Sequence, residues 1–340
     1  MRALVTGGMG FVGRHLARYL VSCGDTVALT YLPPNSPSLV PPSSVLGSVE
    51  GAPPVIEESS VELPRTVQSF ALDVTDRAAV SQLISILKPD VIYHLAAFTF
   101  VPDGEKKSEL VFAVNTFGTQ AILDALVEHS PDTRFLYVSS AEIYGDPRPG
   151  TMPLTELAEL RPVNIYGVAK AAADLMTYKY HVRNGLHTVR VRPFPHLGPG
   201  QSSAFAISGF AKQVAEIKLG KRAPIILVGN LEAKRDYSDV LDIVRGYREA
   251  LLNGKPGDVY NFASGEGIGV GEMLQKLITR AGIQAEIQVD PARIRPVDVA
   301  ELTGSSAKAQ RDFGWKPKVD REASLDALLA YWLEECGSAK

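Results

Sequence analysis

The feature of this chain that most restricts its fold is the alternation of short apolar runs with amphipathic segments along the first 190 residues. Strands that alternate with helices at this spacing build a parallel sheet with helices on both faces. The run DVIYHLAA at 90–97 is apolar almost throughout, as expected for a strand that is covered on both faces. We therefore predict an α/β fold with a doubly wound parallel sheet.

The chain is expected to divide into two unequal parts. Residues 1–190 are predicted to form the doubly wound domain, with a Pro- and Ser-rich stretch at 33–64 that we interpret as an irregular surface insertion. Residues 191–235 and 263–340 are predicted to form a smaller C-terminal α/β lobe that binds substrate. The intervening residues 236–262 are expected to pack back on the first domain.

The overall composition excludes several classes of protein. The 340 residues carry a formal net charge of -3, whereas a nucleic-acid-binding protein usually has a basic stripe. No apolar run has the length of a membrane span, and the first residues lack the pattern of a secretory signal. Cys23 and Cys336 are the only cysteines, and no metal-ligand spacing surrounds them. We expect a cytoplasmic protein with no metal, nucleic-acid or membrane partner.

A glycine-rich loop, TGGMGFVG, follows the first expected strand directly. In such a loop Gly7 permits the tight turn, Gly10 lets the backbone approach a pyrophosphate, and Gly13 lets the next helix lie close to the sheet. The N-terminus of that helix offers unpaired N–H groups to the phosphates. This context predicts a Rossmann domain that binds NAD(P), with Phe11 and Val12 of the loop also at the cofactor.

The sequence leaves the choice between NADP(H) and NAD(H) open, with a slight preference for NADP(H). The second expected strand ends in LTYLPP, without the acidic residue that usually holds the ribose hydroxyls. Arg14 either meets a 2′-phosphate or is a solvated helix residue. Asp73, with Val74 beside it, either accepts from the adenine amino group or belongs to a helix N-cap region.

A second group of residues suits proton transfer to a ketone that receives a hydride. Tyr166 and Lys170 are four residues apart in an expected helix and so share one face. Ser140 and Glu142 follow a buried strand, at the edge of the sheet where ligands bind. An ammonium nearby lowers the pKa of a phenol from its usual value of about 10. We predict that Tyr166 protonates the developing alkoxide, with Lys170 tuning its pKa and Ser140 hydrogen-bonded to the oxygen.

Together, the motifs TGGMGFVG, YHLAA, VSSAEIYG and YGVAK resemble the extended short-chain dehydrogenase/reductase family of nucleotide-sugar enzymes. The C-terminal motifs, such as RPFPHLGPGQS and PARIRPVDV, are similar to those of GDP-4-keto-6-deoxy-D-mannose reductases, with GDP-mannose 4,6-dehydratases as near relatives. The resemblance implies that Ala96 and Ala97 lie along the cofactor. It also implies that the sugar-nucleotide site contains four further residues, Lys212, Asn230, Arg235 and Arg295.

Two residues bear on which reaction the resemblance implies. Glu142 follows Ser140 after one spacer, as in the dehydratases, where a carboxylate removes the C5 proton and helps to expel the C6 hydroxyl. Some reductases carry a carboxylate here too, and a loop carboxylate bonded to backbone donors is the structural alternative. Pro195 stands where the family usually has Asn, and a proline has no side-chain amide to hold a phosphate.

The expected activity is reduction of the C4 ketone of GDP-4-keto-6-deoxy-D-mannose to GDP-D-rhamnose. Dehydration of GDP-mannose, or another nucleotide-sugar epimerase or dehydratase reaction, is the alternative, and a non-catalytic dinucleotide-binding protein is a remote one. The helices expected at 109–129 and 164–181 have broad apolar faces with small residues. These faces either pack on the sheet alone or, as the resemblance implies, also pair two copies into a homodimer through a four-helix bundle.

Overall fold

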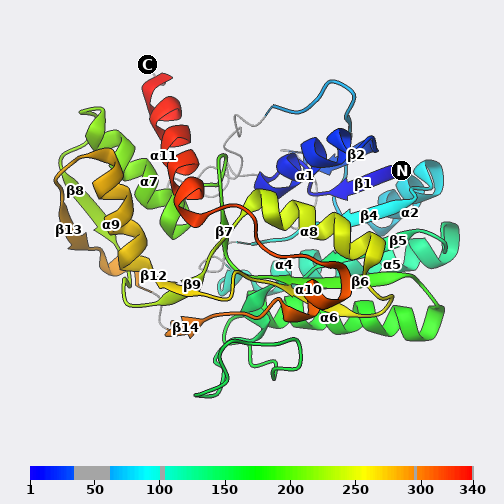
Figure 1. The fold of residues 1–340 in the computed structure, drawn as a ribbon. Coiled ribbons are helices and arrows are strands. Elements are labelled where there is room, and N and C mark those ends of the chain that lie inside the picture. The colour runs from blue at the N-terminus through cyan, green and yellow to red at the C-terminus, as the bar shows by residue number, and fades with distance from the viewer. Residues whose placement is uncertain (34–61, 100–103, 295–296, 339–340) are drawn as a thin grey trace.

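The computed structural model describes residues 1–33, 62–99, 104–294 and 297–338. Its centre is a sheet of seven strands in the order β11-β6-β5-β4-β1-β2-β3, with every neighbouring pair parallel (Figure 1). These strands are β1 (Arg2–Thr6), β2 (Thr26–Tyr31), β3 (Gln68–Ala71), β4 (Val91–His94), β5 (Arg134–Val138), β6 (Thr188–Pro193) and β11 (Val259–Phe262). The predicted doubly wound α/β fold is confirmed.

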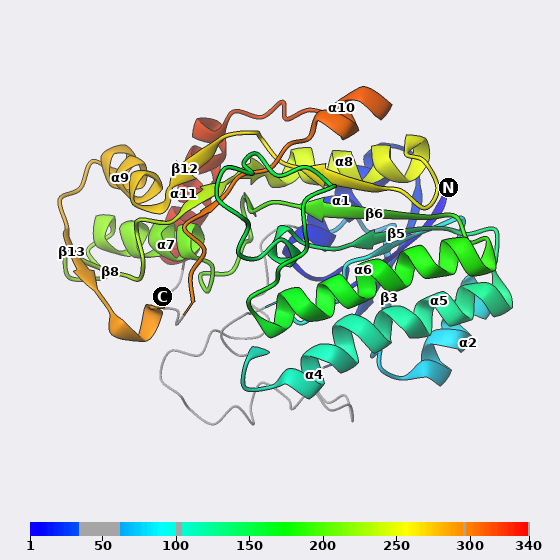
Figure 2. The ribbon, with the colours of Figure 1, turned by 90° about the horizontal axis from the view of Figure 1, so that it is seen from below.

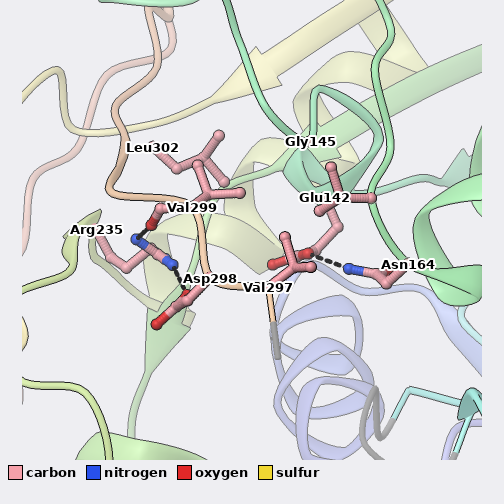
Figure 3. A pocket seen from close by; sticks show the side chains of 9 residues that line it. Glu142, Gly145, Asn164, Arg235, Val297, Asp298, Val299 and Leu302 are labelled. Carbon is pink, nitrogen blue, oxygen red and sulfur yellow. Dashed lines mark hydrogen bonds and ion pairs between the residues drawn. The ribbon is translucent and has the colours of Figure 1, made fainter. Parts of the chain in front are cut away.

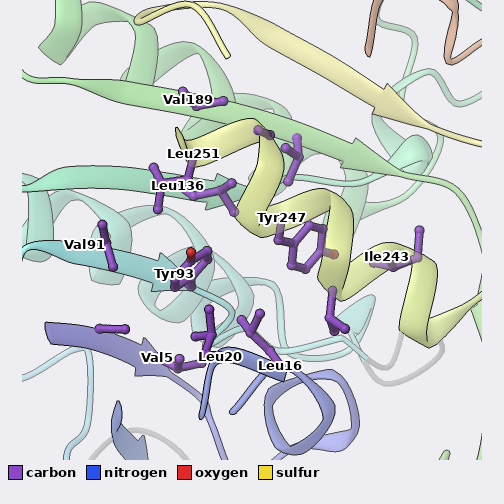
Figure 4. Close-up of a cluster of buried hydrophobic side chains, with 14 of the residues drawn as sticks. Val5, Leu16, Leu20, Val91, Tyr93, Leu136, Val189, Ile243, Tyr247 and Leu251 are labelled. Atoms are coloured by element: carbon purple, nitrogen blue, oxygen red, sulfur yellow. The ribbon is translucent and has the colours of Figure 1, made fainter. Parts of the chain in front are cut away.

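One face of the sheet is covered by α1 (Phe11–Ser22) and α8 (Val240–Asn253). Side chains of a strand point alternately to the two faces, so every second residue of β1, β4 and β5 meets these helices. Val5, Tyr93 and Leu136 are buried in this cluster, together with apolar residues of both helices (Figure 4).

The other face is covered by α2 (Arg77–Leu87), α5 (Gly118–His129) and α6 (Ile165–Asn184). Leu4 and Ile92, each next in sequence to a residue of the first face, are buried among them. A short helix, α4 (Ser108–Phe112), and a π-helical turn, η1 (Ala113–Phe117), lead into α5. Because both faces are covered by helices, the strands are apolar almost throughout.

A second hydrophobic core lies in a smaller lobe beside the sheet (Figures 1 and 2). It is built from α7 (Ala206–Lys218), α9 (Val270–Ala281) and α11 (Arg321–Ser338). α7 packs against α9, α11 and the strand β8 (Ile225–Val228), which pairs in parallel with β13 (Glu286–Val289). The remaining short elements are η2 (Ala141–Ile143), β7 (His196–Leu197), β9 (Lys234–Asp236), β10 (Ser238–Asp239), β12 (Gly267–Gly269), η3 (Pro291–Arg293), β14 (Glu301–Leu302) and α10 (Ala307–Phe313).

The packing changes the proposed division of the chain at one place. The prediction assigned all of 263–340 to the smaller lobe, but Ala309 and Trp315 are buried in the core under α8. Trp315 donates its indole N–H to the Asp242 carbonyl oxygen at 3.0 Å, which fixes this segment on the first domain. We keep the two-lobe division as a proposal, with this segment moved. Of the insertion expected at 33–64, residues 34–61 lie outside the described residues.

The order of the strands determines where a ligand can bind. β1 lies between β2 and β4, so the chain runs outward in opposite directions from this point. In an open parallel sheet, such a reversal leaves a crevice at the carboxyl ends of the strands. The glycine-rich loop follows β1, and the residues after β4 and β5 reach the same edge.

Candidate active site

The three glycines of the loop after β1 have different surroundings. Gly7 has φ +66°, and a Cβ on it would lie 2.8 Å from the backbone of Ala96. A Cβ on Gly13 would lie 2.6 Å from the backbone of Gly8. Gly10 is the N-cap of α1 without a side-chain cap, and a Cβ there would approach the Gly7 oxygen at 3.3 Å. Gly7 and Gly13 are therefore needed for the turn and the helix contact, while Gly10 suits close approach of a phosphate.

The side chains that follow in α1 support this loop. Arg14 is only 9% exposed, and its Nε donates to the Met9 carbonyl oxygen at 2.9 Å. The alternative that Arg14 is a solvated helix residue is therefore wrong. Phe11 stacks on His196 of the smaller lobe with ring centroids 6.2 Å apart, and Val12 packs against the core beneath α1. The loop is thus held both from within and from the neighbouring lobe.

The residue expected near the adenine, Asp73, follows β3, and Ala96 and Ala97, expected along the cofactor, follow β4. Oδ1 of Asp73 accepts from the backbone and hydroxyl of Thr75, whereas Asp76 is the residue that caps α2. Val74 next to it is buried. The backbone N–H of Ala96 donates to Thr6 Oγ1 at 3.3 Å, and Ala97 beside it is half-buried. Asp73 thus lies in the turn that leads to the N-cap of α2, where its carbonyl oxygen accepts from the Asp76 N–H at 3.1 Å, and its contact with adenine stays a prediction.

Ser140, Glu142 and Tyr166 lie together. Ser140 follows β5 and caps η2, where its Oγ accepts from the Glu142 backbone N–H at 3.1 Å. Tyr166 is in the first turn of α6. Burial raises the pKa of Tyr166 to about 12 and the charge of Glu142 adds to the rise, while a hydrogen bond with Ser140 opposes it. The phenol and the hydroxyl can therefore meet a single oxygen atom, as the proposed chemistry requires.

Lys170 lies one helical turn further along α6. Its Nζ donates to the Val138 carbonyl oxygen at 2.5 Å and lies 4.8 Å from the ring centroid of Tyr137. Burial lowers the pKa of Lys170 to about 7, and the charge of Asp174 opposes this. In the protein chain by itself, burial raises the pKa of Tyr166, and the lowering that we expect in the cofactor-bound site stays a prediction.

Asp174 was missed by the sequence analysis. It follows Lys170 by four residues on the same face of α6 and is fully buried. It accepts from Arg190 at 2.8 Å and from Arg192 at 3.1 Å, both on β6. The spacing Tyr166–Lys170–Asp174 was a signal that could have identified it. Asp174 ties the catalytic face of α6 to the sheet.

A pocket opens between these residues and the smaller lobe (Figure 3). Its walls are formed by Glu142, Gly145, Val163, Asn164, Arg235, Val297, Asp298, Val299 and Leu302. Arg235 donates to Asp298 at 2.7 Å and to the Val299 carbonyl oxygen at 2.7 Å, and Asn230 donates to the other oxygen of Asp298 at 2.8 Å. Two of the expected substrate residues are thus joined by Asp298, which the sequence analysis did not single out.

Of the other expected substrate residues, Lys212 does not line this pocket. Lys212 lies on α7, and its Nζ is 5.1 Å from the ring centroid of Trp332. Trp332 belongs to the core of the smaller lobe. Arg295 lies outside the described residues. Pro195 precedes β7, and its carbonyl oxygen accepts from the Ser238 N–H at 3.0 Å.

We searched the described part of the chain for metal sites and membrane-spanning helices. Among these residues, no group of three or more His, Cys, Asp or Glu side chains could hold a metal ion. One helical stretch, Ser108–His129, is long and apolar enough to cross a membrane by length and composition alone, but 67% of its apolar window is buried inside the protein. A buried core helix accounts for this composition.

The family of the chain follows from comparison with known proteins. The family model described as GDP-mannose 4,6 dehydratase matches residues 4–327. The chain belongs to this family. The glycine loop, the Ser140–Tyr166 pair and the pocket all lie within the matched residues of the GDP-mannose 4,6 dehydratase family.

Several proteins of known name are similar over nearly the whole chain. The GDP-6-deoxy-D-mannose reductase of Pseudomonas aeruginosa is 32% identical over 97% of both chains. GDP-mannose 4,6 dehydratase 2 of Arabidopsis thaliana is 28% identical over 98% of this chain and 87% of its own.

Solved structures of similar proteins match the fold of nearly the whole chain. The structure of RMD from Pseudomonas aeruginosa complexed with NADPH has a TM-score of 0.81 at 29% identity, with 98% of this chain and 100% of that chain covered. The UDP-glucose 4-epimerase of Thermus thermophilus complexed with NAD also has a TM-score of 0.81, at 26% identity, with both chains fully covered.

Proposed function

We propose that this protein reduces the C4 ketone of GDP-4-keto-6-deoxy-D-mannose with NADPH and gives GDP-D-rhamnose. The observation that carries the proposal is the contact of Ser140 with Tyr166 after the carboxyl end of β5, at the edge of the sheet where the glycine loop follows β1. The choice of substrate is supported by the 32% identity with a GDP-6-deoxy-D-mannose reductase over 97% of both chains.

Tyr166 is assigned as the acid of this reaction. When bound at the glycine loop, the reduced nicotinamide cofactor would supply a hydride for C4 of the ketone. The phenol donates its proton to the ketone oxygen, and the Ser140 hydroxyl donates a hydrogen bond to the same oxygen. Tyr166 is protonated at neutral pH, as an acid must be. Its pKa of about 12 makes it a weaker acid than an ordinary phenol, so it gives up its proton only to the strongly basic alkoxide that hydride addition creates.

The side of the pocket formed by Arg235 is assigned to the nucleotide diphosphate of the substrate. Arg235 and Asn230 are proposed to bind the nucleotide diphosphate, because a guanidinium fork forms paired hydrogen bonds with phosphate oxygens. Arg235 is joined to Asp298 by an ion pair at 2.7 Å, so the phosphate competes with this carboxylate. Lys212 and Arg295 remain proposals from the resemblance alone, and for Lys212 the contact with Trp332 speaks against a direct role.

NADP(H) is proposed as the cofactor, with NAD(H) as the alternative. A relative of 29% identity was solved with NADPH and one of 26% identity with NAD. Gly7, Gly10 and Gly13 are assigned to the pyrophosphate, and Phe11, Val12, Arg14, Asp73, Val74, Ala96 and Ala97 to the remaining contacts. We further propose that the enzyme works in the cytoplasm.

The test is an assay of the purified protein with GDP-4-keto-6-deoxy-D-mannose and either NADPH or NADH. Reduction predicts loss of the reduced cofactor at a rate that depends on the sugar. No loss with either cofactor would contradict the proposed reduction.

Dehydration of GDP-mannose is the second candidate. It is favoured by Glu142, whose side chain lines the pocket and accepts from the Asn164 amide at 2.9 Å. A carboxylate there can remove the C5 proton of an oxidised sugar. GDP-mannose incubated with NAD(P)+ should then lose water without net change of the cofactor, whereas a reductase alone leaves GDP-mannose intact.

We also propose a homodimer through α6 and the α5 region. Val168, Leu175 and Val182 on α6 are exposed and lie seven residues apart, so they form one apolar stripe on the helix. Phe117, in the π-helical turn before α5, is 55% exposed. A second copy packed on this stripe would remove these side chains from water and form a four-helix bundle.

A further inference from the structure

Asn164 makes two hydrogen bonds to two different parts of the site. Its Oδ1 accepts from the Gly167 backbone N–H at 2.7 Å, which caps the first turn of α6. Its Nδ2 donates to Oε2 of Glu142 at 2.9 Å. Because the oxygen is bound to a donor, the amide has one favourable orientation, with its NH2 group toward Glu142. The side chain therefore connects the helix of Tyr166 to the carboxylate.

The backbone of Glu142 is held against the same helical turn. A Cβ on Gly167 would lie 2.7 Å from the Glu142 carbonyl oxygen, so a glycine is needed for this close approach. The Glu142 N–H donates to Ser140 Oγ at 3.1 Å. These contacts fix the position of the Glu142 backbone, and the hydrogen bond from Asn164 fixes the position of the Glu142 carboxylate.

The carboxylate that Asn164 holds is directed into the pocket. Figure 3 shows Asn164 to one side of the Glu142 carboxylate, with Arg235 and Asp298 on the opposite wall. A glutamate has several rotatable bonds and loses catalytic precision when it is free to turn. The hydrogen bond from Asn164 restricts this rotation without neutralising the charge.

We propose that Asn164 is a positioning residue that holds the Glu142 carboxylate beside Tyr166 and toward the sugar ring of the substrate. This rests on the proposed reduction, in which Glu142 is taken to accept a hydrogen bond from a hydroxyl of the keto sugar and so to orient its C4 carbonyl toward Tyr166. Asn164 also lines the pocket, but its proposed effect on the reaction passes through its hydrogen bond to Glu142.

Two substitutions separate this role from helix capping. Asn164→Ser keeps an oxygen that can cap α6 but removes the amide donor, and Asn164→Asp keeps the cap but places a second carboxylate opposite Glu142. Asn184→Ser makes the same change at the other, exposed end of α6 and is the matched control. The melting temperatures of all three variants should stay within a few degrees of that of the parent.

The decisive experiment is a double-mutant cycle on the reductase kcat. Asn164→Ser should lower kcat about tenfold with KM changed less than about twofold, as is typical for residues that orient a reacting group. In a Glu142→Gln background the same change should lower kcat by less than about twofold. An equal loss in both backgrounds, or a Glu142→Gln enzyme with unchanged kcat, overturns the proposal.

The pH profile supplies a readout that a purely structural role would not move. In Asn164→Asp two carboxylates face each other, so the acidic limb of kcat/KM should shift to higher pH, and Asn184→Ser should leave it in place. An unmoved limb in Asn164→Asp counts against the proposal.

Failure of the proposed function can be told apart from failure of this inference. If the parent enzyme oxidises no NADPH with the keto sugar, the substrate assignment fails. The positioning role of Asn164 is then tested by the conformation of the Glu142 side chain in crystal structures of the parent and the variants. A Glu142 side chain that leaves the pocket in Asn164→Ser supports the positioning role. An unchanged Glu142 conformation contradicts it.

Discussion

At the scale of single residues, the site is dominated by burial rather than by pairs of charges. The pKa of Tyr166 is raised and that of Lys170 is lowered, each chiefly because the side chain is removed from water. A protonated phenol is the correct state for delivering a proton during reduction. The charge of Glu142 raises the pKa of Tyr166 further, and the hydrogen bond with Ser140 lowers it.

Tyr166→Phe removes the acidic proton and keeps the ring. We expect kcat to fall by about 10²–10⁴-fold, the usual contribution of general acid catalysis. The dissociation constant for NADPH should change less than about twofold, because the glycine loop is untouched. Steady-state kinetics and a fluorescence titration of NADPH measure both quantities, and a variant with the parent kcat would refute the assignment of the acid.

Lys170 should make unfolding depend on pH in a defined window. Its pKa is about 7 in the folded chain against 10.5 for the ordinary group, so between these values the unfolded state binds the extra proton. The free energy of unfolding of the parent, relative to Lys170→Met, should therefore rise with pH by about 1.4 kcal/mol per pH unit within this window. Above pH 10.5 the burial of Lys170 costs the folded state no protonation free energy, and this cost grows as the pH falls to about 7.

Urea unfolding of both proteins at a series of pH values measures this difference. Groups that both proteins share cancel in the comparison. A difference that is flat across the window would show that Lys170 is not held in its neutral form by burial.

Sequence patterns identified most of the site but not the directions of its long side chains. The spacing of Tyr166 and Lys170 and the order of the glycines depend on local geometry, which a sequence specifies directly. Lys212 matched a family motif, yet its ammonium lies over Trp332, which is 120 residues later in the chain. Asp298 and Asn164 act through partners distant in sequence, so no local pattern indicated their roles.

At the scale of elements, the β1–loop–α1 unit combines a folding requirement with a binding requirement. Gly13 is needed because the start of α1 touches the backbone of Gly8, whereas a Cβ on Gly10 has its nearest described neighbour at 3.3 Å. Periodicity predicted this unit and the other strand–helix units well, since both faces of the sheet are buried. It could not reveal that α10 returns to the first domain, because that depends on Trp315 finding a site under α8.

A pair of alanine substitutions separates the two requirements. Gly13→Ala places a Cβ 2.6 Å from backbone atoms and should lower the melting temperature by several degrees, the effect of about 1–3 kcal/mol. Gly10→Ala should leave the melting temperature nearly unchanged and weaken NADPH binding by about tenfold or more, because the methyl group occupies the approach of the phosphate. Differential scanning calorimetry and isothermal titration test both. The reverse pattern would contradict the roles given to the two glycines.

At the scale of the whole molecule, the pocket lies where the two lobes meet. Glu142 and Asn164 come from the first domain, and Arg235 and Asp298 from chain segments that lead into the smaller lobe. The stack of Phe11 on His196 and the bond from His15 to the Pro199 oxygen at 2.8 Å join the cofactor loop to the same lobe. The relative position of the lobes therefore affects both the cofactor and the substrate side of the site.

The proposed dimer makes a prediction at this scale. Leu175→Glu places a charge in the middle of the exposed stripe on α6 and should convert the dimer to a monomer, since an unpaired buried charge is costly. Ile86→Glu, on the exposed side of α2, is the control and should leave the assembly unchanged. Light scattering coupled to size exclusion measures the molar mass. A Leu175→Glu protein with the parent mass would place the interface elsewhere.

The central claim is that the site transfers a hydride to a sugar carbon while Tyr166 protonates the oxygen bonded to that carbon. The most direct measurement uses NADPH deuterated at the transferred position, with GDP-4-keto-6-deoxy-D-mannose as substrate and NMR of the product. We predict deuterium at C4 of the sugar and one NADP+ released for each product formed. Deuterium at any other carbon, or a product formed without consumption of NADPH, would contradict this account.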